Sequence, residues 1–447
     1  MDDAVGASLT VGAEAATDSA TALYGRRARV LAVGIAATGL VTFAYFGLAA
    51  HALGRTEYGR ISLLWSVMFV IVSVIYRPIE QLLSRTIAER RARGLDRAHP
   101  LRVPAAIQLA FALAFLLTAL ALRDQLQHDL FGGSSTLYWI LVVGVLAYAA
   151  SYFARGWLAG HERFGLYGGL VLLESMSRFC FPLAVTVGIV SGQTAVALGI
   201  AAAPFVSLLV VPVAFARRAA LGDEGPAAAP RRVRPGSELS LAGGGTFAAA
   251  VLGIMLAEQA LLNAAALVVN ATANDAALAG FVFNVLLIAR APLQLFQSIQ
   301  TSLLPHLAGL HATEDDADFG RAIRVTVAVI CGFTSIVTLG LLAVGPWAMR
   351  LAFTSHFHYQ RGGLVLVGIG MGFHLIAGTL NQAALARSRA GLAAAAWLLS
   401  AALFVGWLAL PTVSDQVLRV ELGYFGATGI LAALLFALYR RPVAPVV

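Results

Sequence analysis

Apolar runs of about 20 residues recur along this chain from one end to the other, separated by short polar segments. A run of this length crosses the roughly 30 Å hydrocarbon core of a bilayer when it forms an α-helix. A helix also satisfies its backbone polar groups within one segment, as a membrane requires. The sequence therefore predicts an all-α integral membrane protein with twelve transmembrane helices. The expected helices cover residues 30–50, 61–83, 103–122, 137–158, 166–190, 194–215, 241–269, 277–304, 325–344, 364–386, 392–410 and 418–438.

The composition excludes a soluble protein of this size. Hydrophobic residues make up 59% of the 447 residues and charged residues 12%, whereas soluble domains have roughly 25% charged residues. All 31 basic residues are arginine, and they produce a formal net charge of +8. Most of these arginines fall in alternate loops, so loop topology explains the charge and no nucleic-acid partner is expected. The positive-inside rule then predicts a multi-pass protein of the cytoplasmic (inner) membrane with both termini in the cytoplasm.

The chain divides near its middle, where a polar, proline-containing stretch separates two sets of six predicted helices. Two halves that start on the same side of the membrane are parallel repeats, related by an axis along the membrane normal. We therefore expect two six-helix lobes. The expected parts are a flexible cytoplasmic tail at 1–27, an N-terminal lobe at 28–216, a cytoplasmic linker at 217–240, a C-terminal lobe at 241–440 and a cytoplasmic tail at 441–447.

An arginine close to a proline occurs inside an apolar segment of each half. Arg77 directly precedes Pro78, and Arg290 lies two residues before Pro292. An intramembrane arginine is costly and is normally kept where it lines a cavity or meets an anion. The repeat predicts an anion-accepting core between the lobes, although an arginine that snorkels from a helix end would give the same pattern.

Four short segments resemble the polysaccharide flippase branch of the multidrug/oligosaccharidyl-lipid/polysaccharide exporter (MOP) superfamily. These segments are residues 53–60, 77–88, 155–165 and 305–307, and they follow one another in the order that this family shows. The resemblance implies alternating access of two six-helix lobes, which flips a polyprenyl-pyrophosphate-linked oligosaccharide from the inner to the outer leaflet for cell-surface polysaccharide assembly. The implied partners are this lipid-linked glycan, membrane lipids and other glycan-assembly membrane proteins.

A pyrophosphate headgroup crosses a membrane only along a polar, preferably cationic, path. A guanidinium suits this role because its planar donor fork binds phosphate oxygens and keeps its charge. We therefore expect Arg77, Arg290 and Arg178 to contact the substrate. Gln294 and Gln297 start a polar stripe after Arg290 and are expected to contact the glycan, although such amides also join helices to one another.

Three acidic residues in predicted helices are candidates for ion coupling. Glu174 lies four residues before Arg178, which favours an intrahelical ion pair. Glu80 lies one turn after Arg77 and is expected to pair with it. Glu258 has no cation nearby in the sequence, so it is either a proton or sodium site or the partner of an arginine from another helix.

Two other functions stay open from the sequence. A cation-coupled multidrug exporter of the same superfamily also has two six-helix lobes, but it would present carboxylates to cationic drugs. A membrane glycosyltransferase or glycan polymerase would need catalytic residues in exterior loops, and Asp124 with Asp129 is the acidic couple available in the first half. No phosphate-binding loop or zinc-protease motif occurs, so no enzymatic activity, cofactor or metal is expected.

Overall fold

The computed structural model describes residues 34, 37–92, 101–161, 163–209, 212, 241–290, 292–293, 296, 316–353 and 358–441, without the side chains of 88, 89, 91, 92, 241–248 and 316. Every regular element among these residues is a helix. Within the described residues, nine helical spans are long and apolar enough to cross a membrane, and three shorter apolar helices accompany them. These segments correspond one to one to the twelve predicted helices, so the chain is an all-α, multi-pass membrane protein.

The first half of the chain forms one helical bundle. Its helices are Ala37–Ala52, α2 (Arg55–Ile75), α3 (Arg77–Ala92), α4 (Arg102–Ala121), α5 (Arg123–Gln125), η1 (Leu126–Leu130), α6 (Ser135–Gly160), α7 (Phe164–Thr186) and α8 (Gln193–Ser207). The second half begins on the far side of the predicted linker, which lies outside the described residues. Its helices are α10 (Leu241–Ala273), Ala276–Arg290, α12 (Asp316–Phe353), α13 (Arg361–Ala386), α14 (Ala390–Ala409) and α15 (Gln416–Arg440).

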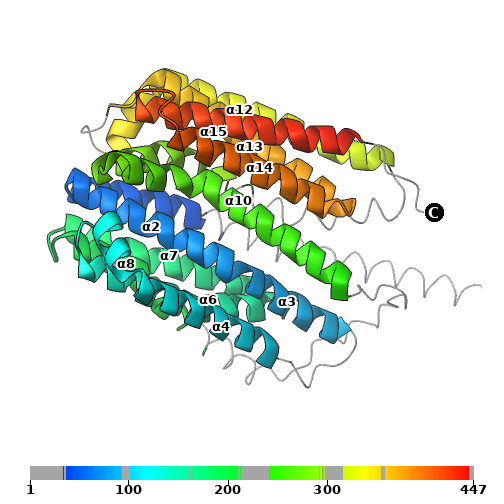
Figure 1. Cartoon of the computed structure of the whole chain (residues 1–447), viewed down its shortest axis with the longest axis horizontal. Helices are drawn as coiled ribbons and strands as arrows, with labels where there is room; N and C mark the ends of the chain where they lie inside the picture. The colour runs from blue at the N-terminus through cyan, green and yellow to red at the C-terminus, as the bar shows by residue number, and fades with distance from the viewer. Residues whose placement is uncertain are drawn as a thin grey trace, which may run out of the picture.

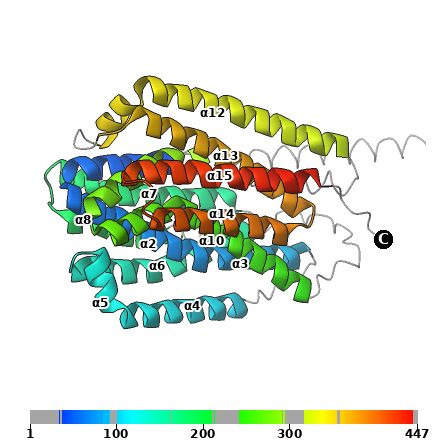
Figure 2. The same ribbon diagram turned by 45° about the horizontal axis from the view of Figure 1, so that its top comes forward.

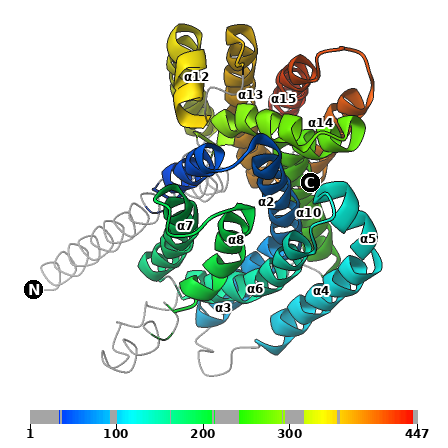
Figure 3. The same ribbon diagram turned by 90° about the vertical axis from the view of Figure 1, so that its left-hand side faces the viewer.

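The two bundles lie side by side (Figure 1). Helices α2 to α8 form one group and helices α12 to α15 the other, and α10 packs against both α14 and α2 (Figure 3). We call the helices up to α8 the N-terminal lobe and the helices from α10 onward the C-terminal lobe. We call the end of the molecule that carries α5, η1 and the start of α2 the α5 end.

The outermost helices have the exposure expected next to lipid. Helix α12 packs against α13 and stands at the edge of the molecule (Figure 2), and only 6% of its apolar window is buried. Helix α4 lies at the opposite edge, where 22% of its window is buried. Apolar side chains exposed over this much surface would aggregate in water, so the exposure agrees with a membrane location.

The Arg-Pro pair of the first half marks a helix break. The sequence predicts one helix over 61–83, whereas the structure has α2 ending before Tyr76 and α3 beginning at Arg77. Pro78 lacks an N–H and cannot donate to the carbonyl of Val74, so the ladder is interrupted at this point. The break places Arg77 at the start of a new helix. Arg290 closes the corresponding helix of the second half, just before Pro292.

Candidate functional site

Close packing of α3 on α6 brings several charged residues together in the N-terminal lobe. A Cβ on Gly156 would lie 2.8 Å from the backbone oxygen of Glu80, and one on Gly160 would lie 2.7 Å from Ile87. Because both positions are glycine, the two helices approach more closely than side chains would allow. This approach places Glu80 of α3 beside Arg155 of α6.

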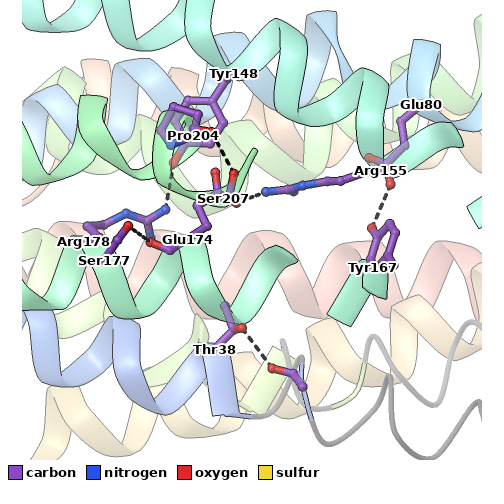
Figure 4. Close-up of polar contacts among 11 residues, drawn as sticks. Thr38, Glu80, Tyr148, Arg155, Tyr167, Glu174, Ser177, Arg178, Pro204 and Ser207 are labelled. Atoms are coloured by element: carbon purple, nitrogen blue, oxygen red, sulfur yellow. Dashed lines mark hydrogen bonds and ion pairs between the residues drawn. The ribbon is translucent and has the colours of Figure 1, made fainter. Parts of the chain in front are cut away.

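Arg155 is the central cation of this cluster. It donates a hydrogen bond to the carboxylate of Glu174 on α7, and the exposed fractions of the two side chains are 11% and 2% (Figure 4). The expected ion pair of Glu174 with Arg178 is therefore wrong. The intrahelical spacing allows that pair, but Arg155 of α6 lies opposite Glu174 and takes its carboxylate instead.

Arg178 rests on neutral groups. Its Nη2 donates to the hydroxyl of Tyr148 at 2.7 Å, and its guanidinium lies 4.7 Å from the ring centroid of Trp65. Among the described residues, its Nε is buried without a hydrogen-bond partner. An aromatic face attracts a cation without supplying a counter-charge, so neither Tyr148 nor Trp65 compensates the guanidinium of Arg178.

Glu80 is shared between two arginines. Its carboxylate accepts a hydrogen bond of 2.7 Å from the hydroxyl of Tyr167 (Figure 4), and it interacts electrostatically with Arg155 and, more weakly, with Arg77. Glu80 thus interacts with Arg77 as expected, but Arg155 is its stronger partner.

Arg77 and Glu258 connect the two lobes. Arg77 belongs to α3 and Glu258 to α10, and each contributes to the electrostatic environment of the other. The sequence left Glu258 with either an ion-binding role or an arginine partner from another helix, and the structure provides the arginine. Opposite charges at this boundary favour contact between the lobes.

Arg290 has a different environment from Arg77, although both lie close to a proline in an apolar segment. Its Nη2 donates to the backbone oxygen of Leu262 and, at 2.9 Å, to Oδ1 of Asn263. The guanidinium carbon lies 4.4 Å from the ring centroid of Phe283. Its Nε is buried and has no hydrogen-bond partner among the described residues. All of these contacts are with neutral groups, so the charge of Arg290 remains available to an anion.

The lobes also meet closely at the α5 end. The Tyr58 hydroxyl of α2 donates to Oδ1 of Asn284, and Asn284 donates to the hydroxyl of Tyr359 at 3.4 Å. Burial raises the pKa of Tyr359 well above the usual tyrosine range, so this hydroxyl stays protonated. A Cβ on Gly59 would lie 1.7 Å from the backbone oxygen of Ala276. These contacts close the α5 end of the lobe boundary.

No family model matches the chain. The chain is 25% identical over 412 residues to an uncharacterized protein of Mycobacterium tuberculosis, covering 88% of this chain and 87% of that protein. It is also 25% identical over 435 residues to an uncharacterized protein of Mycobacterium bovis, covering 92% of this chain and 89% of that protein.

Solved structures give a clearer comparison. An inward-facing multidrug resistance MATE family transporter of the MOP superfamily matches with a TM-score of 0.65 and 14% identity, over 90% of this chain and 94% of that one. A eukaryotic MATE transporter matches with a TM-score of 0.62 and 12% identity, over 93% and 95% of the two chains. A variant of a Vibrio cholerae MATE transporter matches with a TM-score of 0.59 and 14% identity, over 94% of this chain and 97% of that one. The chain has the MATE fold.

The MATE fold confirms the predicted architecture of twelve helices in two lobes. Arg77, Glu258 and Arg290 come from elements of both lobes that meet near the boundary, where α10 packs on α2. Gln294 and Gln297 lie outside the described residues, so their expected glycan contacts stay predictions. No group of three or more His, Cys, Asp or Glu that would hold a metal occurs within the described part of the chain.

Two participants were missed by the sequence analysis. Arg155 lies inside the helix predicted at 137–158 but was not selected as a site residue, whereas the structure buries it in α6. The pair of glycines at 156 and 160 was the available signal, because small residues spaced by four mark close helix packing in membranes. Asn263 was not selected as a site residue, and nothing in the sequence connects it with Arg290.

Proposed function

We propose that this protein is a flippase that moves a polyprenyl-pyrophosphate-linked oligosaccharide from the inner to the outer leaflet of the cytoplasmic membrane. The observation that carries this proposal is the charge balance of the buried residues. Glu174, Glu80 and Glu258 each lie close to arginine, whereas Arg178 and Arg290 rest on neutral groups.

A pyrophosphate headgroup needs positive charge that no carboxylate of the protein already compensates. Moving it through hydrocarbon without compensation is prohibitive, and guanidinium groups bind phosphate oxygens with two parallel hydrogen bonds. Arg290 and Arg178 offer buried N–H donors that lack partners among the described residues. Arg77 would join them once an anion competes with Glu258 for its guanidinium.

The contacts between the lobes support an alternating-access mechanism. The lobes are in close contact at the α5 end, through Tyr58, Asn284 and the Gly59 crossing. With the α5 end outside, as the arginine distribution predicts, contact at this end corresponds to a state closed to the outside, from which the protein would capture substrate on the cytoplasmic side. Separation of the α5 end would then release the headgroup on the other side, while the polyprenyl tail stays in lipid.

A cation-coupled multidrug exporter is the second candidate, because one solved structure with this fold is described as a multidrug resistance transporter. A binding site for cationic drugs requires carboxylates with available charge. Glu174, Glu80 and Glu258 each have an arginine beside them, which favours the anionic substrate.

The first experiment measures the sidedness of lipid-linked oligosaccharides in cells depleted of this protein, with a probe that labels only the outer leaflet. The flippase proposal expects the complete glycan-lipid to accumulate on the inner leaflet. Unchanged sidedness would overturn it, and loss of drug resistance in the same cells would support the multidrug exporter instead. A truncated glycan with unchanged sidedness would indicate a glycosyltransferase.

The site itself is tested by Arg290→Gln and Arg77→Gln in the same cells. Removing a guanidinium that binds phosphate costs about 1.5–3 kcal/mol per charged hydrogen bond, so we expect at least a tenfold loss of flipping for Arg290→Gln. Arg321 is the matched control, because its side chain is 70% exposed on α12. The Arg321→Gln variant should flip the lipid-linked oligosaccharide normally. If Arg77→Gln and Arg290→Gln both restored full flipping in the depleted cells, the cationic site would be ruled out.

A further inference from the structure

The feature that carries this inference is a line of two buried amides behind Arg290. Nδ2 of Asn263 donates to the backbone oxygen of Gln259 at 3.2 Å and to its Oε1 at 3.1 Å, while Oδ1 of Asn263 accepts from Arg290. The exposed fractions of Gln259 and Asn263 are 9% and 3%. The orientation of the Asn263 amide is therefore set from both sides.

The chemical nature of these partners decides what Arg290 can bind. A carboxylate at position 263 would also fix the guanidinium, and with a stronger hydrogen bond. It would cancel the charge as well, which is the arrangement that Arg155 and Glu174 form in the other lobe. An amide oxygen fixes the guanidinium and leaves its charge uncompensated. The two lobes thus hold buried arginines in opposite ways.

We propose that Asn263, oriented by Gln259, is the residue that reserves Arg290 for an anionic substrate. Asn263 acts as a positioning and charge-selectivity residue and does not itself contact the pyrophosphate. This inference rests on the proposed function, because it deepens the role of the same site. It assigns anion selectivity to a neutral residue of α10 rather than to the number of arginines.

The test compares Asn263→Asp with Asn263→Leu in the full chain, embedded in lipid nanodiscs, with radiolabelled farnesyl pyrophosphate as the probe. Asp has nearly the same shape and keeps an acceptor for Arg290, whereas Leu removes every polar contact. A purely structural role would make Leu at least as damaging as Asp. If Asn263 acts through charge selectivity, Asp should be more damaging than Leu.

We expect Asn263→Asp to weaken binding about 10- to 100-fold, the range for losing a charge-assisted contact, and Asn263→Leu to weaken it only about fivefold, as for a neutral hydrogen bond. Asn381→Asp is the matched control, because this asparagine is also buried but accepts its hydrogen bond from Nε1 of Trp397 at 3.2 Å. It should bind the probe within about threefold of the unmodified protein, a difference below 1 kcal/mol.

Three results would overturn the inference. Binding by Asn263→Asp within threefold of the unmodified protein, or weaker binding by Asn263→Leu than by Asn263→Asp, would remove the selectivity role and leave the flippase proposal intact. Failure of the unmodified protein to bind the probe would overturn both. If Asn263→Asp does not fold, Gln259→Glu takes its place, and this carboxylate one step further from Arg290 should still weaken binding severalfold.

Discussion

Two charged residues in the N-terminal lobe, Arg155 and Glu174, depend on each other for their place in the membrane. Each is almost completely buried, with 11% and 2% of the side chain exposed. A buried pair adds little net stability, because desolvation offsets the attraction, but removing one partner leaves an uncompensated charge. Substitution of one partner should therefore destabilise the protein more than substitution of both.

The prediction at this scale is a double-mutant cycle. Arg155→Met alone should destabilise the protein by about 3–5 kcal/mol, since Glu174 would lose its counter-charge. The double variant Arg155→Met with Glu174→Met should recover most of this loss. Thermal unfolding in detergent compares the two single variants, Arg155→Met and Glu174→Met, with the double variant, and a double variant at least as unstable as Arg155→Met would contradict the pairing.

Helix α2 crosses the helix Ala276–Arg290 at a point where both backbones lack side chains. A Cβ on Gly59 would lie 1.7 Å from the Ala276 oxygen, and one on Gly280 would lie 2.8 Å from Cα of Gly59. Backbone atoms cannot move aside to accept an added Cβ, as the end of a flexible side chain can. The crossing, together with the hydrogen bond of Tyr58 to Asn284, decides how closely the lobes approach at the α5 end.

Gly59→Ala should therefore favour the state in which the α5 end is separated. Overpacking at such a contact costs roughly 1–3 kcal/mol, which is enough to shift a two-state equilibrium by tenfold or more. Distance measurements between spin labels on α2 and α12 would detect a longer mean distance. Gly169→Ala is the control, because nothing lies within 4 Å of its Cβ, and equal distances in both variants would disprove the role of the crossing.

The orientation of the whole molecule follows from the arginines in its loops. One correction concerns Arg155, which lies inside α6 and does not count toward a loop. The remaining arginines still favour the end opposite α5, and by the positive-inside rule this asymmetry predicts that this end faces the cytoplasm. The direction of transport in the proposed function depends on this orientation.

Cysteine labelling tests the orientation at the two ends of α14. This helix has 20 residues, about 30 Å at 1.5 Å per residue, and Ser388 and Thr412 are exposed beyond its opposite ends. With Cys180 and Cys331 replaced by serine, a membrane-impermeant maleimide should label Thr412→Cys in intact cells. Ser388→Cys should react only after permeabilisation, and the opposite pattern would invert the topology.

The sequence by itself determined the class of the fold and the approximate positions of its helices. This was possible because the thickness of a bilayer sets the length of each apolar run, and that length is a local property of the chain. The same reasoning located Arg77, Arg178 and Arg290 inside the membrane, since a charge within an apolar run is visible without a structure. Helix ends were less certain, since the helix predicted to end at residue 158 continues to Gly160 in α6.

Only the tertiary structure decided which charges meet. Glu174 is four residues from Arg178 in sequence but pairs with Arg155, 19 residues away on another helix. Arg290 meets Asn263 at a separation of 27 residues, and Glu258 meets Arg77 across the lobe boundary. Such pairings depend on the depth and rotation at which whole helices pack, and glycines such as Gly156 and Gly59 fix these through contacts that no local pattern contains.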